Sequence, residues 1–231
     1  MARHEILKAE NLSKTYRMGR IDVPALNRVN LEVEKGDFIV IRGPSGSGKT
    51  TLLNLLGALD NPTSGEVWIE DTNITREKER GLSRIRCLKI GFVFQFYNLI
   101  PKMHALDNVQ LPMIFAKTPR EIRKRKAEEL LKAVSLEHRL EHRPSELSAG
   151  EQQRVAIARA LANDPIIILM DEPTGNLDDE NTQSIMRLLE KLNKERKQTF
   201  ILTTHNVSLT KYANKVHFLH NGTLTSSPKY V

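Results

Sequence analysis

Residues 38–50 read Phe38-Ile39-Val40-Ile41-Arg42-Gly43-Pro44-Ser45-Gly46-Ser47-Gly48-Lys49-Thr50, and this segment is the most informative part of the sequence about the fold class. Its apolar first half predicts a buried strand, and the leucine-rich segment that follows Lys49 predicts a helix. The glycines between the two elements let successive backbone N–H groups turn inward, where a Cβ atom would obstruct them. A strand, a glycine-rich loop and a helix N-terminus in succession predict a binding site for phosphate oxygens.

The spacing of Gly43, Gly48, Lys49 and Thr50 matches the Walker A pattern of P-loop proteins. The Lys49 ammonium can reach the β- and γ-phosphates of a nucleotide, and the Thr50 hydroxyl can ligate Mg²⁺. The positive N-terminal end of the helix adds to the attraction for phosphate. The predicted phosphate-binding residues are Gly43, Pro44, Ser45, Gly46, Ser47, Gly48, Lys49, Thr50 and Thr51.

Strands and helices alternate in the first and last parts of the chain and flank a mainly helical middle. Strands are predicted near residues 6–9, 27–33, 38–42, 66–69, 90–94, 166–170, 200–203 and 216–219. Helices are predicted from Lys49 through Leu56, near residues 149–163 and over residues 179–196. The fold class is therefore α/β, a P-loop NTPase core with a mainly parallel sheet, an N-terminal antiparallel β region and an inserted helical subdomain.

The length of 231 residues allows one large domain or a core with an inserted lobe. Hydrophobic residues make up 39% and charged residues 27%, which is ordinary for a folded globular protein. We expect a single domain over residues 1–231. Residues 1–98 and 163–231 are expected to form its catalytic α/β core, and residues 99–162 its helical subdomain.

A second feature is the apolar run 166–170, which Asp171 and Glu172 follow directly. The run predicts a buried parallel strand, and α/β sheets place ligand sites at the C-terminal ends of such strands. Asp171 suits the outer shell of Mg²⁺, and Glu172 can polarise a water for attack on the γ-phosphate. Two acids after an apolar strand are weak evidence alone, but they become strong evidence beside a Walker A pattern.

A third feature is the segment Leu147-Ser148-Ala149-Gly150-Glu151. Ser148 and Glu151 have the spacing of a capping box, and an amphipathic helix follows them. The pattern by itself can indicate no more than a well-capped helix. The N-terminus of such a helix can also bind an anion, and these two interpretations stay open at this point.

The three features, in this order and spacing, resemble the nucleotide-binding subunit of an ABC (ATP-binding cassette) transporter over the whole chain. Residues 147–151 resemble the signature motif of that family, and residues 176–178 resemble its D-loop. Tyr16 resembles its adenine-stacking aromatic residue, Gln95 the glutamine of its Q-loop, and His205 its switch histidine.

The resemblance implies an ATPase in which two copies of the chain sandwich two ATP molecules head to tail. Each site would combine the Walker A and B segments of one copy with the signature helix of the other. Ser148 and Gly150 would therefore contact the γ-phosphate in trans. Glu172 would be the general base, while His205 and Gln95 would position the γ-phosphate and the water. ATP binding would close the homodimer and hydrolysis would reopen it.

The site residues that the resemblance implies fall into three groups, with ATP and Mg²⁺ as the bound species. The catalytic residues would be Glu172, His205, Gln95 and Lys49. Tyr16 would bind the nucleotide together with the phosphate loop, and Ser148 and Gly150 would bind it from the other copy. The metal ligands would be Thr50, Gln95 and Asp171.

Four segments resemble the lipoprotein-release and macrolide-exporter branch of the family, namely residues 43–49, 94–101, 151–154 and 174–178. That branch moves lipoproteins, peptides or hydrophobic drugs, or it uses ATP to drive mechanical work across the membrane. The resemblance implies integral membrane permease subunits as partners, which receive the motion through residues 96–101. We expect the permease to be a separate chain or to lie outside this sequence, and the protein to be peripheral on the cytoplasmic face of the cell membrane.

Ala149 departs from the commoner signature motif, which has glycine at this position. A residue just after the helix cap needs an ordinary helical φ, which alanine tolerates. Its methyl group is expected to crowd the phosphates bound by the other copy. We therefore expect slower hydrolysis or weaker ATP-driven dimerisation, without loss of function.

The bulk composition excludes several function classes. The longest apolar run, 166–170, is far too short to span a bilayer, and the single cysteine, Cys87, excludes an internal disulfide. The net charge of +7 is densest at residues 120–126, but this segment has the pattern of a helix with a solvated charged face. No nucleic-acid partner is expected.

Two alternatives belong to other function classes. A non-transport ABC ATPase that acts on DNA or ribosomes usually carries two cassettes, coiled-coil arms or zinc modules, and this length holds none of them. A P-loop kinase or GTPase would lack the signature helix, and no guanine-specifying N-K-x-D segment follows the P-loop. The transported substrate and the direction of transport are not encoded in any residue singled out above.

Overall fold

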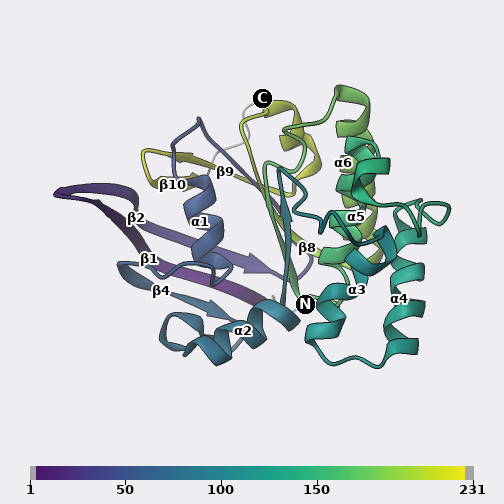
Figure 1. Ribbon diagram of the computed structural model, residues 1–231. Helices are drawn as coiled ribbons and strands as arrows, with labels where there is room; N and C mark the ends of the chain where they lie inside the picture. The colour runs from purple at the N-terminus through teal and green to yellow at the C-terminus, as the bar shows by residue number, and fades with distance from the viewer. Residues whose placement is uncertain (1–3, 227–231) are drawn as a thin grey trace.

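The computed structural model describes residues 4–226 and contains two β-sheets (Figure 1). The first is antiparallel, with the strand order β2-β1-β4-β5. Its strands are β1 (Glu5–Met18), β2 (Ile21–Glu34), β4 (Ser64–Ile69) and β5 (Thr72–Asn73). β1 and β2 form a long hairpin that projects from the rest of the chain in Figure 1. This sheet confirms the predicted N-terminal antiparallel region.

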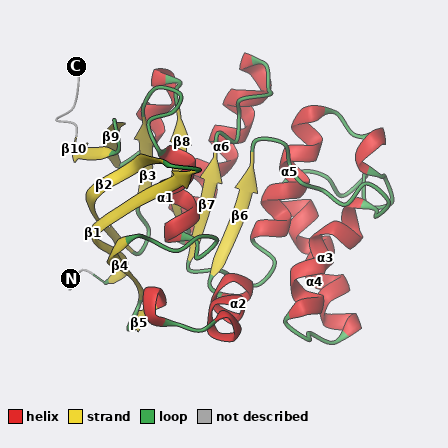
Figure 2. Cartoon of the chain, turned by 60° about the vertical axis from the view of Figure 1, so that its left-hand side comes forward, coloured by secondary structure: helices red, strands yellow, loops and turns green. Residues whose placement is uncertain are grey.

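The second sheet has six strands in the order β10-β9-β3-β8-β7-β6. Its strands are β3 (Phe38–Arg42), β6 (Ile90–Phe94), β7 (Ile167–Asp171), β8 (Thr199–Thr204), β9 (Lys215–His220) and β10 (Thr223–Ser226). All neighbours are parallel except β9 and β10. The predicted mainly parallel sheet is therefore confirmed, and Figure 2 shows the arrows of β3, β6, β7 and β8 side by side.

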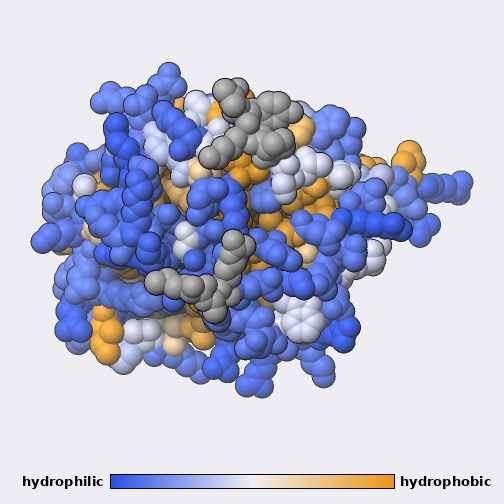
Figure 3. Space-filling view, turned by 180° about the vertical axis from the view of Figure 1, so that it is seen from behind, coloured by the Kyte–Doolittle hydropathy of each residue, from blue (hydrophilic) through white to orange (hydrophobic). Residues whose placement is uncertain are grey.

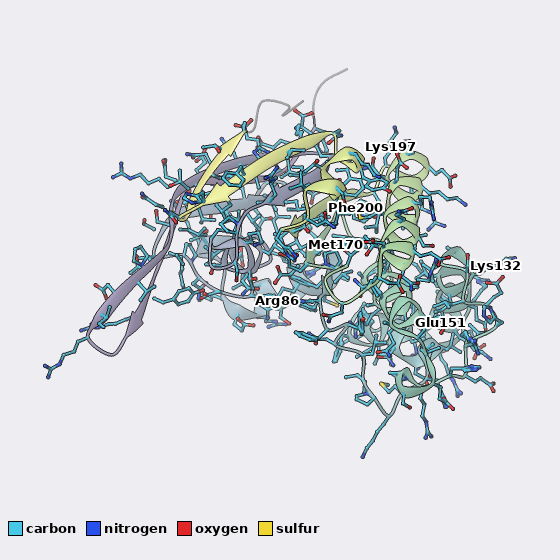
Figure 4. All side chains as sticks on the ribbon, turned by 90° about the horizontal axis from the view of Figure 1, so that it is seen from above. Arg86, Lys132, Glu151, Met170, Lys197 and Phe200 are labelled. Carbon is cyan, nitrogen blue, oxygen red and sulfur yellow. The ribbon has the colours of Figure 1, made fainter. Side chains whose placement is uncertain are left out.

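The apolar runs of the central strands are continuous because both faces of the second sheet are covered. In β3, Phe38 and Val40 pack into one hydrophobic core, and Ile39 and Ile41 pack into the other. Full burial of each such side chain contributes about 1.5–3 kcal/mol. Figure 4 shows Met170 and Phe200, from the neighbouring strands β7 and β8, in the interior of the molecule.

The helices divide between these two cores. α1 (Lys49–Leu56) and α2 (Glu79–Leu88) pack into the core that also holds the antiparallel sheet. α3 (Ala105–Phe115), α4 (Arg120–Ala133), α5 (Ala149–Ala160) and α6 (Asp179–Arg196) pack on the other face, as Figure 1 shows. Short 3₁₀ turns occupy Ile74–Arg76, Pro144–Glu146 and Val207–Tyr212. α3, α4 and α5 lie within the segment 99–162, whose role as a separate subdomain stays a prediction.

Some boundaries differ from the expected ones. β1 and β2 have 14 residues each, because cross-strand pairing extends them through polar segments without an alternating apolar pattern. α5 ends at Ala160, three residues before the predicted end near Asn163, because the N–H groups of Ala162 and Asp164 donate to carbonyl oxygens three residues earlier instead of four. α2 and β10 were not predicted.

The face seen in Figure 3 is mostly hydrophilic, and apolar colour is confined to separate patches. The basic segment 120–126 lies in α4, and its residues Arg120, Lys124 and Arg125 are exposed, whereas Leu130 and Leu131 of the same helix are buried. None of the helices within residues 4–226 has the length and apolar character needed to cross a membrane.

Candidate active site

A cleft of about 710 Å³ brings together side chains that are far apart in the sequence. It lies where β3 and β7 end and α1 begins. The residues that line it are Tyr16, Ala25, Ser45, Gly46, Gly48, Lys49, Thr50, Thr51, Gln95, Asp171, Glu172 and His205. Ala25 is the one residue of this lining that sequence reasoning missed, because nothing in its neighbourhood indicates contact with the P-loop.

The N-terminus of α1 faces the cleft, because its N-cap and first residues line it. The N-cap of α1 is Gly48, which has a φ of 103° and supplies no side-chain cap. A Cβ atom at this position would lie 2.5 Å from the carbonyl oxygen of Ala25, so both the φ and the packing require glycine. The first N–H groups of α1 are thus left for an anion. The predicted phosphate-binding residues Gly43, Pro44 and Ser47 are not among the residues that line the cleft.

Lys49 is buried and held inside the loop. Its ammonium donates to the carbonyl oxygens of Gly43 at 2.9 Å and Pro44 at 3.0 Å. Its Nζ also lies 3.5 Å from Glu172 Oε1. A buried cation is stable only with such partners, so these contacts keep the ammonium at the entrance of the loop.

Asp171 is held by two hydroxyl groups, one on each carboxylate oxygen. Thr50 Oγ1 donates to Oδ2 at 2.8 Å, and Thr203 Oγ1 donates to Oδ1 at 2.7 Å. The Thr50 hydroxyl and the Asp171 carboxylate are oxygen ligands of the kind that Mg²⁺ prefers. Residues 4–226 contain no group of three or more His, Cys, Asp or Glu side chains that could hold a metal ion. A hydroxyl and a carboxylate suit Mg²⁺, which is usually bound through one or two carboxylates together with phosphates and water.

Glu172 lies between a cation and a histidine. Its Oε2 is 3.0 Å from His205 Nδ1, and its side chain is 15% exposed against 70% for His205. The φ of Glu172 is 45°, a left-handed value that is uncommon for a residue other than glycine and is concentrated at functional sites. The turn after β7 thus directs this carboxylate into the cleft, toward Lys49 on one side and His205 on the other.

Gln95 is tied to the segment that resembles a D-loop. Its Nε2 donates to Asn176 Oδ1 at 3.3 Å, and Asn176 Nδ2 donates to the Gln95 carbonyl oxygen at 3.0 Å. The two residues are 81 positions apart, so only the folded chain brings them together.

Tyr16 lines the cleft from β1 and is 37% exposed. Its hydroxyl donates to Asp60 Oδ2 at 2.8 Å, and Lys14 Nζ lies 4.8 Å from the centre of its ring. Burial and the hydrogen bond to Asp60 raise the pKa of the Tyr16 hydroxyl, which therefore stays a donor at neutral pH. Sequence reasoning missed Lys14 and Asp60, because Asp60 lies 44 positions from Tyr16 and carries no motif signal.

Ser148 and Gly150 are not among the residues that line this cleft. Ser148 Oγ accepts from the Glu151 N–H at 3.3 Å, and Glu151 Oε2 accepts from the Ser148 N–H at 2.8 Å, so the predicted capping box is confirmed. A Cβ atom on Gly150 would lie 2.4 Å from Asn181 Oδ1 of α6. Figure 4 shows Glu151 on the side of the molecule opposite the β1–β2 hairpin. The chain therefore presents the cap of α5 apart from its own cleft.

The sequence of this chain is similar to one family model and to individual proteins of that family. Residues 26–175 match the family model described as ABC transporter. The chain is 52% identical over 205 residues to an ABC transporter ATP-binding protein of Thermotoga maritima, and the match covers 89% of this chain and 87% of that protein. It is 48% identical over 221 residues to the lipoprotein-releasing system ATP-binding protein LolD of Saccharophagus degradans, with 95% and 96% covered.

A solved structure extends this similarity to three dimensions. It is the dimeric post-hydrolysis state of the ATP-binding cassette MJ0796, of Methanocaldococcus jannaschii, bound to ADP and Pi. The TM-score is 0.88 at 44% identity, and the match covers 97% of this chain and all of that one.

Proposed function

The chain belongs to the ABC transporter family, and from this premise we propose that it powers a permease that exports or extracts a peptide, a lipoprotein or a hydrophobic compound. It is an ATP-binding and ATP-hydrolysing subunit of a transporter. The similarity to a lipoprotein-releasing relative supports the choice of branch. One observation carries the hydrolytic part of the proposal: the Glu172 carboxylate lies between the Lys49 ammonium and the His205 ring inside one cleft.

In this proposal Glu172 is the general base. Its carboxylate accepts a proton from the attacking water, and the contact with His205 keeps it oriented. Lys49 exchanges its bonds to the carbonyl oxygens of Gly43 and Pro44 for phosphate oxygens, which are stronger acceptors because they are charged. Gln95 would position the water and the γ-phosphate from the cleft wall.

Thr50 and Asp171 would hold Mg²⁺, with Gln95 as a further ligand. When it is bound, this ion neutralises charge that develops on the β- and γ-phosphate oxygens. The adenine base would stack on the partly exposed Tyr16 ring, which Asp60 anchors through the hydroxyl.

A second copy of the chain would complete each site. Ser148 and Ala149 are exposed at the N-terminus of α5, where helix N–H groups can bind an anion. Because these residues do not line their own cleft, their access to a γ-phosphate requires a partner chain. The dimeric structures of the MJ0796 cassette support the pairing of two chains.

We expect Ala149→Gly to raise ATP turnover or to lower the ATP concentration at the midpoint of dimerisation. Ala149 is the first residue of α5 and is exposed, so its methyl group points to solvent or to a partner's phosphates. Relief of about 1 kcal/mol of crowding corresponds to about a fivefold gain. Steady-state turnover and size-exclusion titration with ATP check this, and a variant unchanged in both would contradict the expectation.

The motion of α5 would reach the permease through residues 96–101. Arg159, near the C-terminal end of α5, donates to the carbonyl oxygens of Tyr97 at 2.6 Å and Asn98 at 2.5 Å. Both acceptor residues have left-handed φ values, 61° and 48°. Burial lowers the pKa of Arg159 to about 10, so the guanidinium stays charged and holds this strained turn to the helix.

A groove beside this turn is the proposed permease contact. Its volume is about 1040 Å³, and residues of α2, β6 and α3 line it together with Asn98 and Arg159. Phe115, which is 71% exposed, contributes apolar surface, and Arg86, labelled in Figure 4, contributes positive charge. An apolar groove with an arginine-containing border is typical of a protein contact.

Phe115→Asp tests this contact. We expect about tenfold lower recovery of an integral membrane permease in pull-downs from detergent-solubilised membranes, as for loss of an aromatic anchor. Ile122→Asp is the matched control, because Ile122 is 48% exposed on α4 and does not line the groove. Equal recovery with the two variants would place the permease elsewhere. Recovery of no membrane protein by the wild type would contradict the proposed function.

A further inference from the structure

Thr203 lies beside the two acids of the cleft, and none of the roles described above includes it. It is in β8, where its Cα is the partner of the Asp171 Cα across the parallel pair β7–β8. Its side chain is 0% exposed. Neighbouring strands are about 4.8 Å apart, so the register alone places the Thr203 hydroxyl next to the Asp171 carboxylate.

The Thr203 hydroxyl both donates and accepts a hydrogen bond. It donates to Asp171 Oδ1 at 2.7 Å, and it accepts from the Glu172 N–H at 3.3 Å. The carbonyl oxygen of Met170, also at 3.3 Å, is a second acceptor within reach of the same proton. One buried hydroxyl therefore contacts three consecutive residues at the end of β7.

The hydroxyl groups of Thr50 and Thr203 both donate to the Asp171 carboxylate, but only one of these hydrogen bonds is expected to break when a nucleotide and a metal ion bind. Thr50 would release Asp171 Oδ2 as its oxygen turns to a metal ion. Thr203 is buried away from the cleft lining, so its bond to Oδ1 can persist while nucleotide enters and leaves. A charge-assisted hydrogen bond of this kind orients a carboxylate more strictly than a neutral bond does.

Thr203 also supports the unusual backbone of Glu172. The Glu172 N–H donates to the Thr203 carbonyl oxygen at 3.2 Å as well as to its hydroxyl. A left-handed φ at a residue other than glycine costs energy and persists only where the surroundings hold it. The same threonine thus holds the acid at the proposed metal site and the main chain of the proposed base.

We propose that Thr203 is a positioning residue for hydrolysis, which orients the Asp171 carboxylate and the Glu172 main chain through its hydroxyl. This inference rests on the roles proposed above for Asp171 and Glu172. According to this proposal, metal-dependent nucleotide binding and turnover depend on the Thr203 hydroxyl and not on its methyl group or on the buried volume of the side chain.

Thr203→Val and Thr203→Ser separate these properties, since valine keeps the shape and serine keeps the hydroxyl. We expect Thr203→Val to lower kcat about tenfold to a hundredfold, the effect of losing a hydrogen bond to a charged group. In a Glu172→Gln background, which stops turnover, its ATP affinity in EDTA should equal that of the parent. The gain in affinity on adding Mg²⁺, measured by calorimetry, should be about tenfold smaller. Thr203→Ser should restore both quantities to within about threefold.

Thr199→Val is the matched control, because Thr199 is a fully buried threonine of the same strand whose hydroxyl accepts from the Gly36 N–H at 2.9 Å. It should lower the melting temperature without changing kcat. If Thr203→Val does not fold, Thr203→Ala replaces it. The proposal is overturned if the folded Val or Ala variant keeps wild-type kcat and metal dependence, or if Thr203→Ser loses as much as it does. Sustained turnover in Glu172→Gln would instead overturn the proposed role of Glu172 as the base.

Discussion

Glu172→Gln is expected to stop steady-state ATP turnover while the chain still binds ATP and accumulates as a dimer. The amide keeps the shape of the side chain but cannot accept the proton of the attacking water. Loss of a general base typically lowers the rate about 100-fold to 10,000-fold. The substitution also removes a negative charge from the cleft, where Glu172 lies 15% exposed and 3.5 Å from Lys49. Less repulsion of the γ-phosphate favours the ATP-bound dimer.

Size-exclusion chromatography with ATP and magnesium, beside a phosphate-release assay, measures both effects. The variant should elute as a dimer with ATP, whereas the wild type should elute mainly as a monomer. Glu190→Gln is the matched control, since Glu190 pairs with Lys194 at 2.8 Å on the surface of α6 and does not line the cleft. Turnover that persists in Glu172→Gln would show that another group is the base.

Lys49→Met is expected to weaken ATP binding by about 100-fold or more, the usual scale for removing a preorganised charge from a phosphate site. Methionine fills the space of the lysine stem, so the loop should keep its shape. The phosphates would lose the one ammonium that contacts the carbonyl oxygens of Gly43 and Pro44 within the P-loop. Glu172 would lose a cation at 3.5 Å but keep His205 at 3.0 Å, so the apo protein should still fold.

Equilibrium dialysis with ATP measures the loss, and circular dichroism checks the fold. Lys126→Met is the control, because it removes the same charge from α4, where Lys126 pairs with Asp164 outside the cleft. ATP affinity within about threefold of the wild type, which is less than 1 kcal/mol, would mean that Lys49 does not contact the phosphates.

The features that sequence reasoning predicted correctly depend on residues close in the chain. The P-loop is a strand, a turn and a helix within 38–56, and the capping box of α5 joins Ser148 to Glu151, three residues later. Caps and turns close hydrogen bonds over a few residues, so residue type and spacing are sufficient to indicate them. The position of Glu172 after an apolar strand is a local signal of the same kind.

Contacts between distant segments were missed for the opposite reason. The anchor of Tyr16 on Asp60 and the pair Gln95–Asn176 each join residues without a shared motif. Such contacts form because packing of the core brings two surfaces together. The local sequence around each residue does not identify its partner, since many side chains fit the same position in a strand or loop. The grooved surface near Phe115 likewise depends on the placement of α2, β6 and α3.

The phosphate loop, the two acids and the capped helix can all be predicted from the amino-acid sequence, because each is a local pattern. The residues that surround each of them depend on how the whole chain folds. The strand order puts β8 between β3 and β7, although β8 follows both in the chain. That order brings Thr203 against Asp171, and the folded chain leaves the cap of α5 outside the lining of the cleft. The strand order allows both faces of the sheet to be buried at once. This requirement involves the whole chain, so no single segment of the sequence indicates it.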